Sequence, residues 1–317
     1  MKDIKKLQQQ YKDGEMNRRD FVKAVGALGI TLSAAGSFLK ATDAMAKSPK
    51  KGGSVRMASN LHGPDDQMDP IVMTSNIDYT RAHTAYNGLV QMRDNMVVSP
   101  ELAEEFSPNA NATEWTFKLR QGVKFHDGSS FSADDVLWSM NRHLGEKSPS
   151  VIKGFFSQVK EWKKMDSHTV KAVLNSPDSD LPAKLTEKQA KIVKKGTTDF
   201  KKGNGTGPYR LKSFEPGVKS LHERNEDYWR ETANFDAIEI TAITDPQARV
   251  NALIAGDMHM ISDVDAKAIK LIEGSNGVHV NSTKSGRYGG ICCLKNTAPG
   301  NNADFVKGMQ LIQDRER

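Results

Sequence analysis

The chain of 317 residues has little cysteine: Cys292 and Cys293 are its only two, and they are adjacent. Neighbouring cysteines rarely meet disulfide geometry. The eight histidines are scattered, and neither a Cys-x-x-Cys nor a His-x-x-x-His spacing occurs. Because zinc sites are built from such spacings, the sequence predicts no metal site and no cofactor. Two buried thiols on a strand are expected, with a redox or metal role as the alternative.

Signatures of hydrolytic or nucleotide chemistry are also missing. No Gly-x-Ser-x-Gly elbow occurs, and no catalytic pair of carboxylates stands out. The glycine run at 203–207 leads into an alternating strand pattern, whereas a phosphate loop leads into a helix. His126 and Asp127 lie beside Ser129 on a tight turn, where a catalytic triad cannot easily converge. We therefore expect no catalytic residues and no enzyme activity.

A long apolar run is absent. The apolar stretch at 24–39 has only 16 residues, whereas a membrane span needs roughly 20 strongly apolar ones. A twin-arginine pattern with an aromatic residue precedes this stretch and a small-x-small cleavage site follows it: Arg18, Arg19, Phe21, Ala44 and Ala46. This order predicts that residues 1–46 form an export signal recognised by the twin-arginine translocase. A membrane anchor is the alternative.

The basic charge balance does not indicate a nucleic-acid partner. The chain has a net charge of +6 and an isoelectric point near 9.1. Residues 1–46 hold eight Lys/Arg and five Asp/Glu, so +3 of this charge lies in the signal. No basic cluster alternates with aromatic residues. We expect no nucleic acid among the partners of the exported part.

Among the patterns that are present, the segment beginning at Trp115 is the most informative. Its first six residues alternate apolar and polar side chains, which predicts a half-buried strand. Turns at Gly122 and Gly128 indicate that this strand continues into a hairpin. Ser132, three residues before Asp135, predicts the cap of a helix. The aromatic residues are expected in the core: Trp115, Phe117 and Phe125.

Other segments give a coarse secondary structure. A short strand is expected at 54–58, and a helix at 77–89. A hairpin is expected where Tyr209–Phe214 is followed by a turn and a second strand ending at Glu223. A helix is expected at 245–256, with Asp245 as its cap.

Sequence blocks spread over nearly all of residues 54–317 carry a resemblance to a known family. They include the segment at 115–136, a Met-Asp-Pro turn at 68–70 and a Tyr-x-Gly-Leu helix end at 86–90. They also include a Gly-Thr-Gly-Pro-Tyr strand entry at 203–209, an Asn-x-x-Tyr-Trp motif at 225–229 and a final Asp-Arg-Glu helix at 296–316. Together they resemble the periplasmic solute-binding proteins of the peptide/nickel ABC importers. Glu226 stands where that family has proline, and His259 where it usually has aspartate.

The resemblance implies an α/β fold of the periplasmic binding protein type II kind, with two lobes and an extra subdomain in lobe one. The second lobe is expected to be mostly missing. The implied domains are the export signal at 1–46, lobe one at 47–92 and 200–285, and the subdomain inserted into lobe one at 93–199. The crossover and the start of lobe two follow at 286–317.

The resemblance also implies a function. The protein is expected to be a monomer in the periplasm of a Gram-negative bacterium. Closure of its two lobes about a hinge would trap a small solute for delivery to the permease subunits of an ABC importer. Short peptides are the expected ligand, and a nickel chelate, haem, an oligosaccharide or an opine are alternatives. The expected ligand contacts are Ser59, Asn60, Leu61, Arg287 and Tyr288. Arg287 suits a ligand carboxylate, although a surface arginine would look the same.

Two other classes remain open from the residues alone. An exported hydrolase would turn over a peptide that it binds. A periplasmic chaperone or docking protein would need only the outer surface of the lobes.

Overall fold

The computed structural model describes residues 7, 21, 23–25, 28, 51–60, 66–93, 96–231, 233–282 and 294–312. They fall into two compact units, Met1–Val278 and His279–Arg317. Within the described residues, each helix is too short or too polar to span a bilayer.

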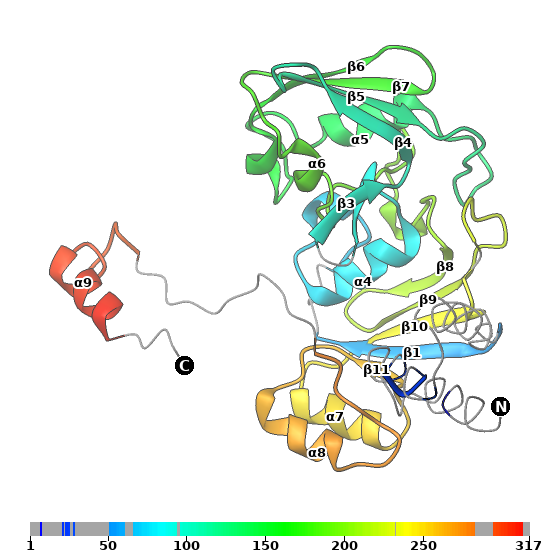
Figure 1. The fold of residues 1–317 in the computed structure, drawn as a ribbon, viewed down its shortest axis with the longest axis vertical. Helices are drawn as coiled ribbons and strands as arrows, with labels where there is room; N and C mark the ends of the chain where they lie inside the picture. The colour runs from blue at the N-terminus through cyan, green and yellow to red at the C-terminus, as the bar shows by residue number, and fades with distance from the viewer. Residues whose placement is uncertain are drawn as a thin grey trace. The chain divides into compact units, whose positions relative to one another are not determined.

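A five-stranded mixed sheet with strand order β11-β1-β10-β9-β8 lies in the first unit (Figure 1). Its strands are β1 (Ser54–Ser59), β8 (Tyr209–Glu215), β9 (Lys219–Arg224), β10 (Ala237–Ala242) and β11 (Met260–Ile261). β1 pairs in parallel with both β10 and β11, whereas β9 pairs antiparallel with β8 and β10. The strand predicted at 54–58 and the hairpin predicted from Tyr209 are therefore confirmed.

Helix α4 (Asn76–Ala85) packs on this sheet against β1, β8 and β10. Ser75 caps it, and the Ser75 N–H donates in return to the carboxylate of Asp78 over 3.1 Å. The helix ends earlier than the predicted position 89. The reason is that the carbonyl of Ala85 accepts from the N–H of Gly207 over 3.0 Å, which joins the helix end to a distant loop.

A buried ion pair ties α4 to the segment before it. The side chains of Arg81 and Asp66 are fully buried, with the guanidinium 2.5 Å from the carboxylate. The Arg81 guanidinium also lies over the ring of Phe214 on β8, 4.9 Å from its centroid. Since a buried charge is costly without a partner, this pair fixes the helix in one position on the sheet.

A second sheet in the same unit has four antiparallel strands in the order β4-β5-β7-β6 (Figure 1). Its strands are β4 (Ala103–Pro108), β5 (Glu114–Leu119), β6 (Val159–Lys164) and β7 (Thr169–Leu174), and helix α5 (Ala133–Asn141) packs on β6 and β7. The strand predicted at Trp115 is confirmed, but its predicted hairpin partner is wrong. β5 pairs with β4 and β7, because the residues after Gly122 form a separate tight turn with one bridge, Lys124 to Ser130.

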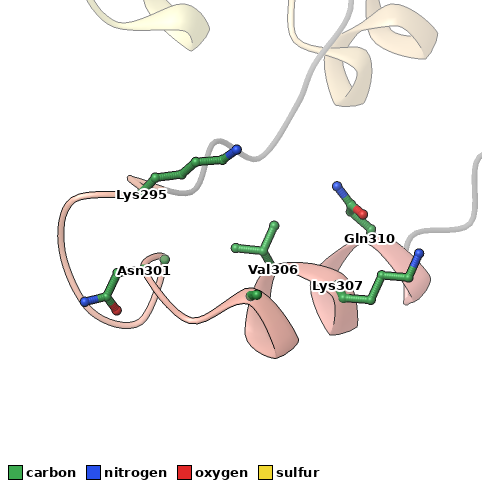
Figure 2. A pocket seen from close by; sticks show the side chains of 7 residues that line it. Lys295, Asn301, Val306, Lys307 and Gln310 are labelled. Carbon is green, nitrogen blue, oxygen red and sulfur yellow. The ribbon is translucent and has the colours of Figure 1, made fainter.

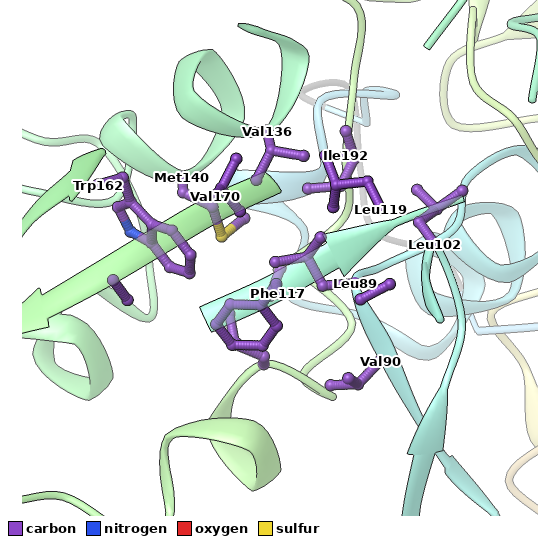
Figure 3. Close-up of a cluster of buried hydrophobic side chains, with 14 of the residues drawn as sticks. Leu89, Val90, Leu102, Phe117, Leu119, Val136, Met140, Trp162, Val170 and Ile192 are labelled. Atoms are coloured by element: carbon purple, nitrogen blue, oxygen red, sulfur yellow. The ribbon is translucent and has the colours of Figure 1, made fainter. Parts of the chain in front are cut away.

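The main hydrophobic core lies between this sheet and α5 (Figure 3). Phe117 is fully buried, with its ring centroid 5.7 Å from that of Trp162 and 6.2 Å from that of Phe106. Trp115 and Phe125 are 7% and 1% exposed. The prediction that these three aromatic residues are core is therefore confirmed.

The predicted cap of α5 is also confirmed. The N–H of Ser132 donates to Oδ2 of Asp135 over 2.8 Å. The other carboxylate oxygen of Asp135 accepts from the N–H of Lys195 over 2.9 Å. The cap therefore also holds the chain that returns towards the five-stranded sheet.

The remaining elements are short. In the first unit they are β2 (Val90–Arg93), β3 (Val97–Pro100), α6 (Leu181–Lys184), α7 (Pro246–Ile254), α8 (Ile269–Glu273) and the 3-10 turns Pro70–Val72, Lys153–Phe156, Phe200–Lys202 and Ala266–Ala268. Helix α7 begins after its predicted cap, Asp245, whose side chain accepts from the N–H of Ala248 over 2.6 Å. The second unit contains α9 (Ala303–Leu311), capped by Asn302.

Candidate functional site

The carboxyl ends of the parallel strands β1 and β11 bring polar side chains together. Ser59 ends β1 and is 4% exposed, and its Oγ lies 2.6 Å from the Oγ of Ser262, the first residue after β11. The Ser59 hydroxyl also lies 3.3 Å from Oδ1 of the half-buried Asn60. In open sheets with parallel strands, ligands bind outside this end of the strands. We therefore take it as the candidate site.

Asp263 completes this polar edge. Its backbone is left-handed, with φ at 55°, a conformation that few residues other than glycine adopt. Its Oδ1 accepts from Nδ2 of Asn76 at the start of α4 over 2.6 Å, and its Oδ2 accepts from the hydroxyl of Ser262 over 3.0 Å. The carboxylate is thus fixed by two neutral donors while the residue stays exposed.

Arg249 on α7 holds the loops of this edge from beneath. It is 2% exposed. Its guanidinium donates to the carbonyls of Ile243 and Thr244 after β10, over 2.7 and 3.0 Å. It also donates to the carbonyls of Ser262 and Asp263 after β11, over 3.2 and 3.0 Å. One buried side chain therefore sets the position of two strand ends.

The structure describes only part of the predicted site. Ser59 and Asn60 lie at the polar edge, and sequence reasoning missed the other members, Asn76, Arg249, Ser262 and Asp263. The only local signal was a Ser-Asp pair directly after a short apolar strand. The other predicted contacts, Leu61, Arg287 and Tyr288, lie outside the described residues, as do Cys292 and Cys293.

The predicted export signal is described at few positions. Phe21 is fully buried. The other named signal residues, Arg18, Arg19, Ala44 and Ala46, lie outside the described residues.

His126, the histidine of the apparent triad, serves as a structural link. Its Nε2 lies 3.0 Å from the carbonyl oxygen of Gly207, and its Nδ1 lies 3.2 Å from the carbonyl oxygen of Gly203 and 3.4 Å from the N–H of Gly205. Burial lowers the pKa of His126, which favours a neutral ring. The hydroxyl of Ser129 donates instead to Asp127, over 2.6 Å. The three side chains therefore do not form a nucleophile–base relay.

The sequence blocks at 86–90, 203–209 and 225–229 contact each other. Oδ1 of Asn87 accepts from the hydroxyl of Thr206 over 3.1 Å and from the indole N–H of Trp229 over 3.2 Å. Nδ2 of Asn87 donates to buried Glu101 over 2.8 Å. These blocks thus bind the two sheets of the unit together.

The second unit carries a depression of its own (Figure 2). Side chains from α9 and the turn before it line it, among them Lys295, Asn301, Val306, Lys307 and Gln310. It contains none of the predicted contacts. In the described part of the chain, no group of three or more His, Cys, Asp or Glu side chains converges as a metal site would require.

Comparisons with known proteins agree with the two-sheet architecture. The model of the bacterial extracellular solute-binding proteins, family 5, matches residues 97–317. The di/tripeptide-binding protein 1 of Pseudomonas aeruginosa is 29% identical over 249 residues, which are 66% of this chain and 46% of that protein. The chain spans about half the length of the curated relatives it matches.

Two solved structures show the same fold. The periplasmic binding protein DppA of Helicobacter pylori, in complex with the peptide STSA, superposes with a TM-score of 0.65 at 26% identity, covering 72% of this chain and 50% of that chain. The binding protein AgaA of A. tumefaciens R10, in complex with agropinic acid, gives 0.66 at 27%, covering 71% and 46%. The predicted α/β fold of the type II periplasmic binding proteins is thereby confirmed.

Proposed function

Because the chain belongs to the bacterial extracellular solute-binding proteins of family 5, we propose that it captures short peptides in the periplasm for an ABC importer. The ligands named for its relatives differ, from di- and tripeptides to agropinic acid. A peptide ligand is favoured because the relative that matches at 29% identity over 249 residues is a di/tripeptide-binding protein.

The observation that carries the proposal is the polar edge at the end of β1. Ser59, Ser262 and Asp263 present hydroxyl and carboxylate groups beside the open ends of three parallel strands. A binding protein needs such a wall, which a second lobe closes against the ligand to remove it from water. The proposed contacts of this chain are Ser59, Asn60, Leu61, Arg287 and Tyr288, with lobe boundaries as predicted from the sequence.

The same proposal includes the route and the partners. We propose export by the twin-arginine translocase, which carries folded proteins, and release of residues 1–46. The exported protein would act as a monomer and dock on the permease subunits of the importer. None of these steps requires a cofactor or catalysis by the chain.

Isothermal titration of the complete protein with an equimolar pool of di- to pentapeptides tests the proposal. We expect saturable heat, and mass spectrometry should recover every peptide intact. Shortened peptides would instead indicate a hydrolase. Absence of heat with every peptide would overturn peptide binding, and the same titration with a nickel–histidine complex, haem, an oligosaccharide and an opine would then identify the ligand class.

A further inference from the structure

We infer that a pocket at the β8 edge of the five-stranded sheet binds a small anion with two negative charges, a phosphate or a dicarboxylate. The pocket has a volume of about 370 Å³, which is within the range of about 300–1,000 Å³ usual for ligand pockets. β8 and β11 are the opposite edges of this sheet, so the pocket lies away from the polar edge described above. The inference therefore goes beyond the proposed capture of peptides.

Two parts of the first unit form the walls of the pocket. One wall is the tight turn before α5, with His126 and Asp127, and the other surrounds the start of β8, with Lys202, Asn204, Arg210 and Leu211. The N–H of Asp127 donates to Oδ1 of Asn204 over 3.1 Å, and Nδ2 of Asn204 donates to Oδ2 of Asp127 over 3.0 Å. This pair of contacts fixes the two walls relative to each other.

Asp127, the acidic residue of the walls, is already neutralised. Its Oδ1 accepts from the N–H and the hydroxyl of Ser129 over 2.9 and 2.6 Å. Its Oδ2 accepts from Nζ of Lys194 over 2.8 Å, in addition to the contact with Asn204. Because a carboxylate offers about four acceptor positions, these contacts leave no capacity for a ligand cation.

His126 does not add a charge to the pocket either. Its ring nitrogens lie 3.0 and 3.2 Å from the carbonyl oxygens of Gly207 and Gly203, and burial lowers its pKa, which favours a neutral ring. The main-chain N–H groups of Gly203 and Gly207 are also in use, since they donate to the carbonyls of Phe200 and Ala85. An anion would therefore be recognised by side chains and not by a loop of free amides.

The two cations of the walls retain free donors. Among the described residues, the exposed side chain of Lys202 makes neither a hydrogen bond nor an ion pair. Arg210 donates through Nε to Asn225 over 3.0 Å and through Nη2 to Asp227 over 2.7 Å, which leaves Nη1 for a further acceptor. Asn225 is 2% exposed and holds the guanidinium in place. The side chain of Asp227 is 71% exposed, so water screens its pair with Arg210.

This arrangement favours an anion with two charges. Lys202 supplies a point charge and Arg210 supplies a positioned planar donor, so a ligand with several acidic oxygens can contact both. Leu211 adds an apolar side to the pocket, which suits the short carbon chain of a dicarboxylate. Phosphate and a dicarboxylate share the charge but differ in shape, so they are separate arms of the test.

NMR line widths of inorganic phosphate and of succinate, each titrated against the full chain at constant ionic strength, test the inference. We expect saturable broadening. Lys202→Gln should weaken anion binding about fivefold or more, because a charge-assisted contact is lost. Lys201→Gln removes the same charge from the neighbouring exposed position, which does not line the pocket, and should change the affinity by less than about twofold.

Asp227→Asn gives a prediction of the opposite sign. This variant frees Arg210 from its exposed partner, so the anion should bind more tightly. If the pair of Arg210 and Asp227 had only a structural role, the variant would lower stability and leave the affinity for the anion unchanged. Circular dichroism spectra check that each variant keeps the fold.

The outcomes separate the ligand classes. Saturation by phosphate alone or by succinate alone supports the site and names its class, and saturation by both supports recognition by charge. Equal losses in Lys202→Gln and Lys201→Gln would mean an adventitious ion only and would overturn the inference, as would the absence of saturable broadening by either anion. None of these measurements uses a peptide, so failure of the inference leaves the proposed function intact.

Discussion

The indole N–H of Trp229 donates to Oδ1 of Asn87 over 3.2 Å, a contact between residues 142 positions apart. Asn87 follows α4, and Trp229 follows β9. The same amide oxygen accepts from Thr206, in the loop that bonds to the end of α4. Three separate stretches of sequence thus share one buried side chain, and the junction should be sensitive to small changes in volume.

We expect Gly205→Ala to disrupt this junction. A Cβ at Gly205 would lie 2.0 Å from the carbonyl oxygen of Ala85 and 2.5 Å from the ring of Tyr86. Main chain cannot yield easily, so the cost should be about 1–3 kcal/mol or more. Urea denaturation measures it. Gly154→Ala, where a Cβ meets open space, should change stability by no more than about 0.5 kcal/mol; equal effects of the two variants would refute the packing argument.

Phe117→Ala should destabilise the protein without changing its affinity for the ligand. Phe117 is fully buried in the core between the four-stranded sheet and α5, and removal of such a side chain costs about 3–5 kcal/mol. Thermal melting should show the loss, and affinity should be retained below the new melting temperature. Phe235→Ala, at a ring that is 44% exposed, is the control with a much smaller effect. A loss of affinity without loss of stability would assign Phe117 to the site instead.

Stability should fall between pH 7 and pH 5, in part through His143. Burial, followed by the charge of Arg142, lowers the pKa of His143 from 6.5 to about 4. The unfolded chain therefore binds a proton in this window that the folded chain does not. The contribution of neutral His143 to the free energy of unfolding is fully present above pH 6.5. It is lost as the pH falls towards 4, by about 1.4 kcal/mol per pH unit.

Urea midpoints of the unaltered protein and His143→Gln at pH 7 and pH 5 test this contribution. The variant should show a shallower dependence on pH, whatever its stability at pH 7. His279→Gln changes an exposed ring and should keep the original dependence. Parallel curves for the unaltered protein and His143→Gln would rule out a contribution from His143.

Export should depend on the two arginines of the predicted signal. Arg18→Lys together with Arg19→Lys keeps the charge but removes the pattern that the twin-arginine translocase recognises. We expect the precursor to remain in the cytoplasm, as followed by cell fractionation and immunoblotting. Lys50→Arg with Lys51→Arg, beyond the predicted cleavage site, should be exported normally. A normal periplasmic yield from the arginine double variant would exclude this route.

Local patterns predicted local structure well. Ser132 and Asp135 lie three residues apart, so the cap of α5 was visible in the sequence, as was the start of α7 at Asp245. The partners of β5 were not visible. β7 lies some fifty residues further along the chain, and nothing in the alternating pattern at Trp115 specifies which strand it will join.

The candidate site was predicted only where it follows a strand that the sequence defines. Ser59 ends β1, so its place at a sheet edge could be inferred. Asn76 and Asp263 are 187 positions apart, and β11 has only two residues. Their meeting depends on parallel pairing across most of the chain, which periodicity cannot reveal.

The strands that pair with β1, β10 and β11, are synthesised long after β1, and this order has a consequence during translation. Gly53, beside β1, bonds to Asp236, 183 positions later, whereas all strands of the four-stranded sheet lie within residues 103–174. Since domains fold as the ribosome delivers them, the inner subdomain can close while β1 is still without partners. A ribosome that stalls before β10 would therefore release a chain with a folded centre and an unpaired first strand, the form that most needs a chaperone.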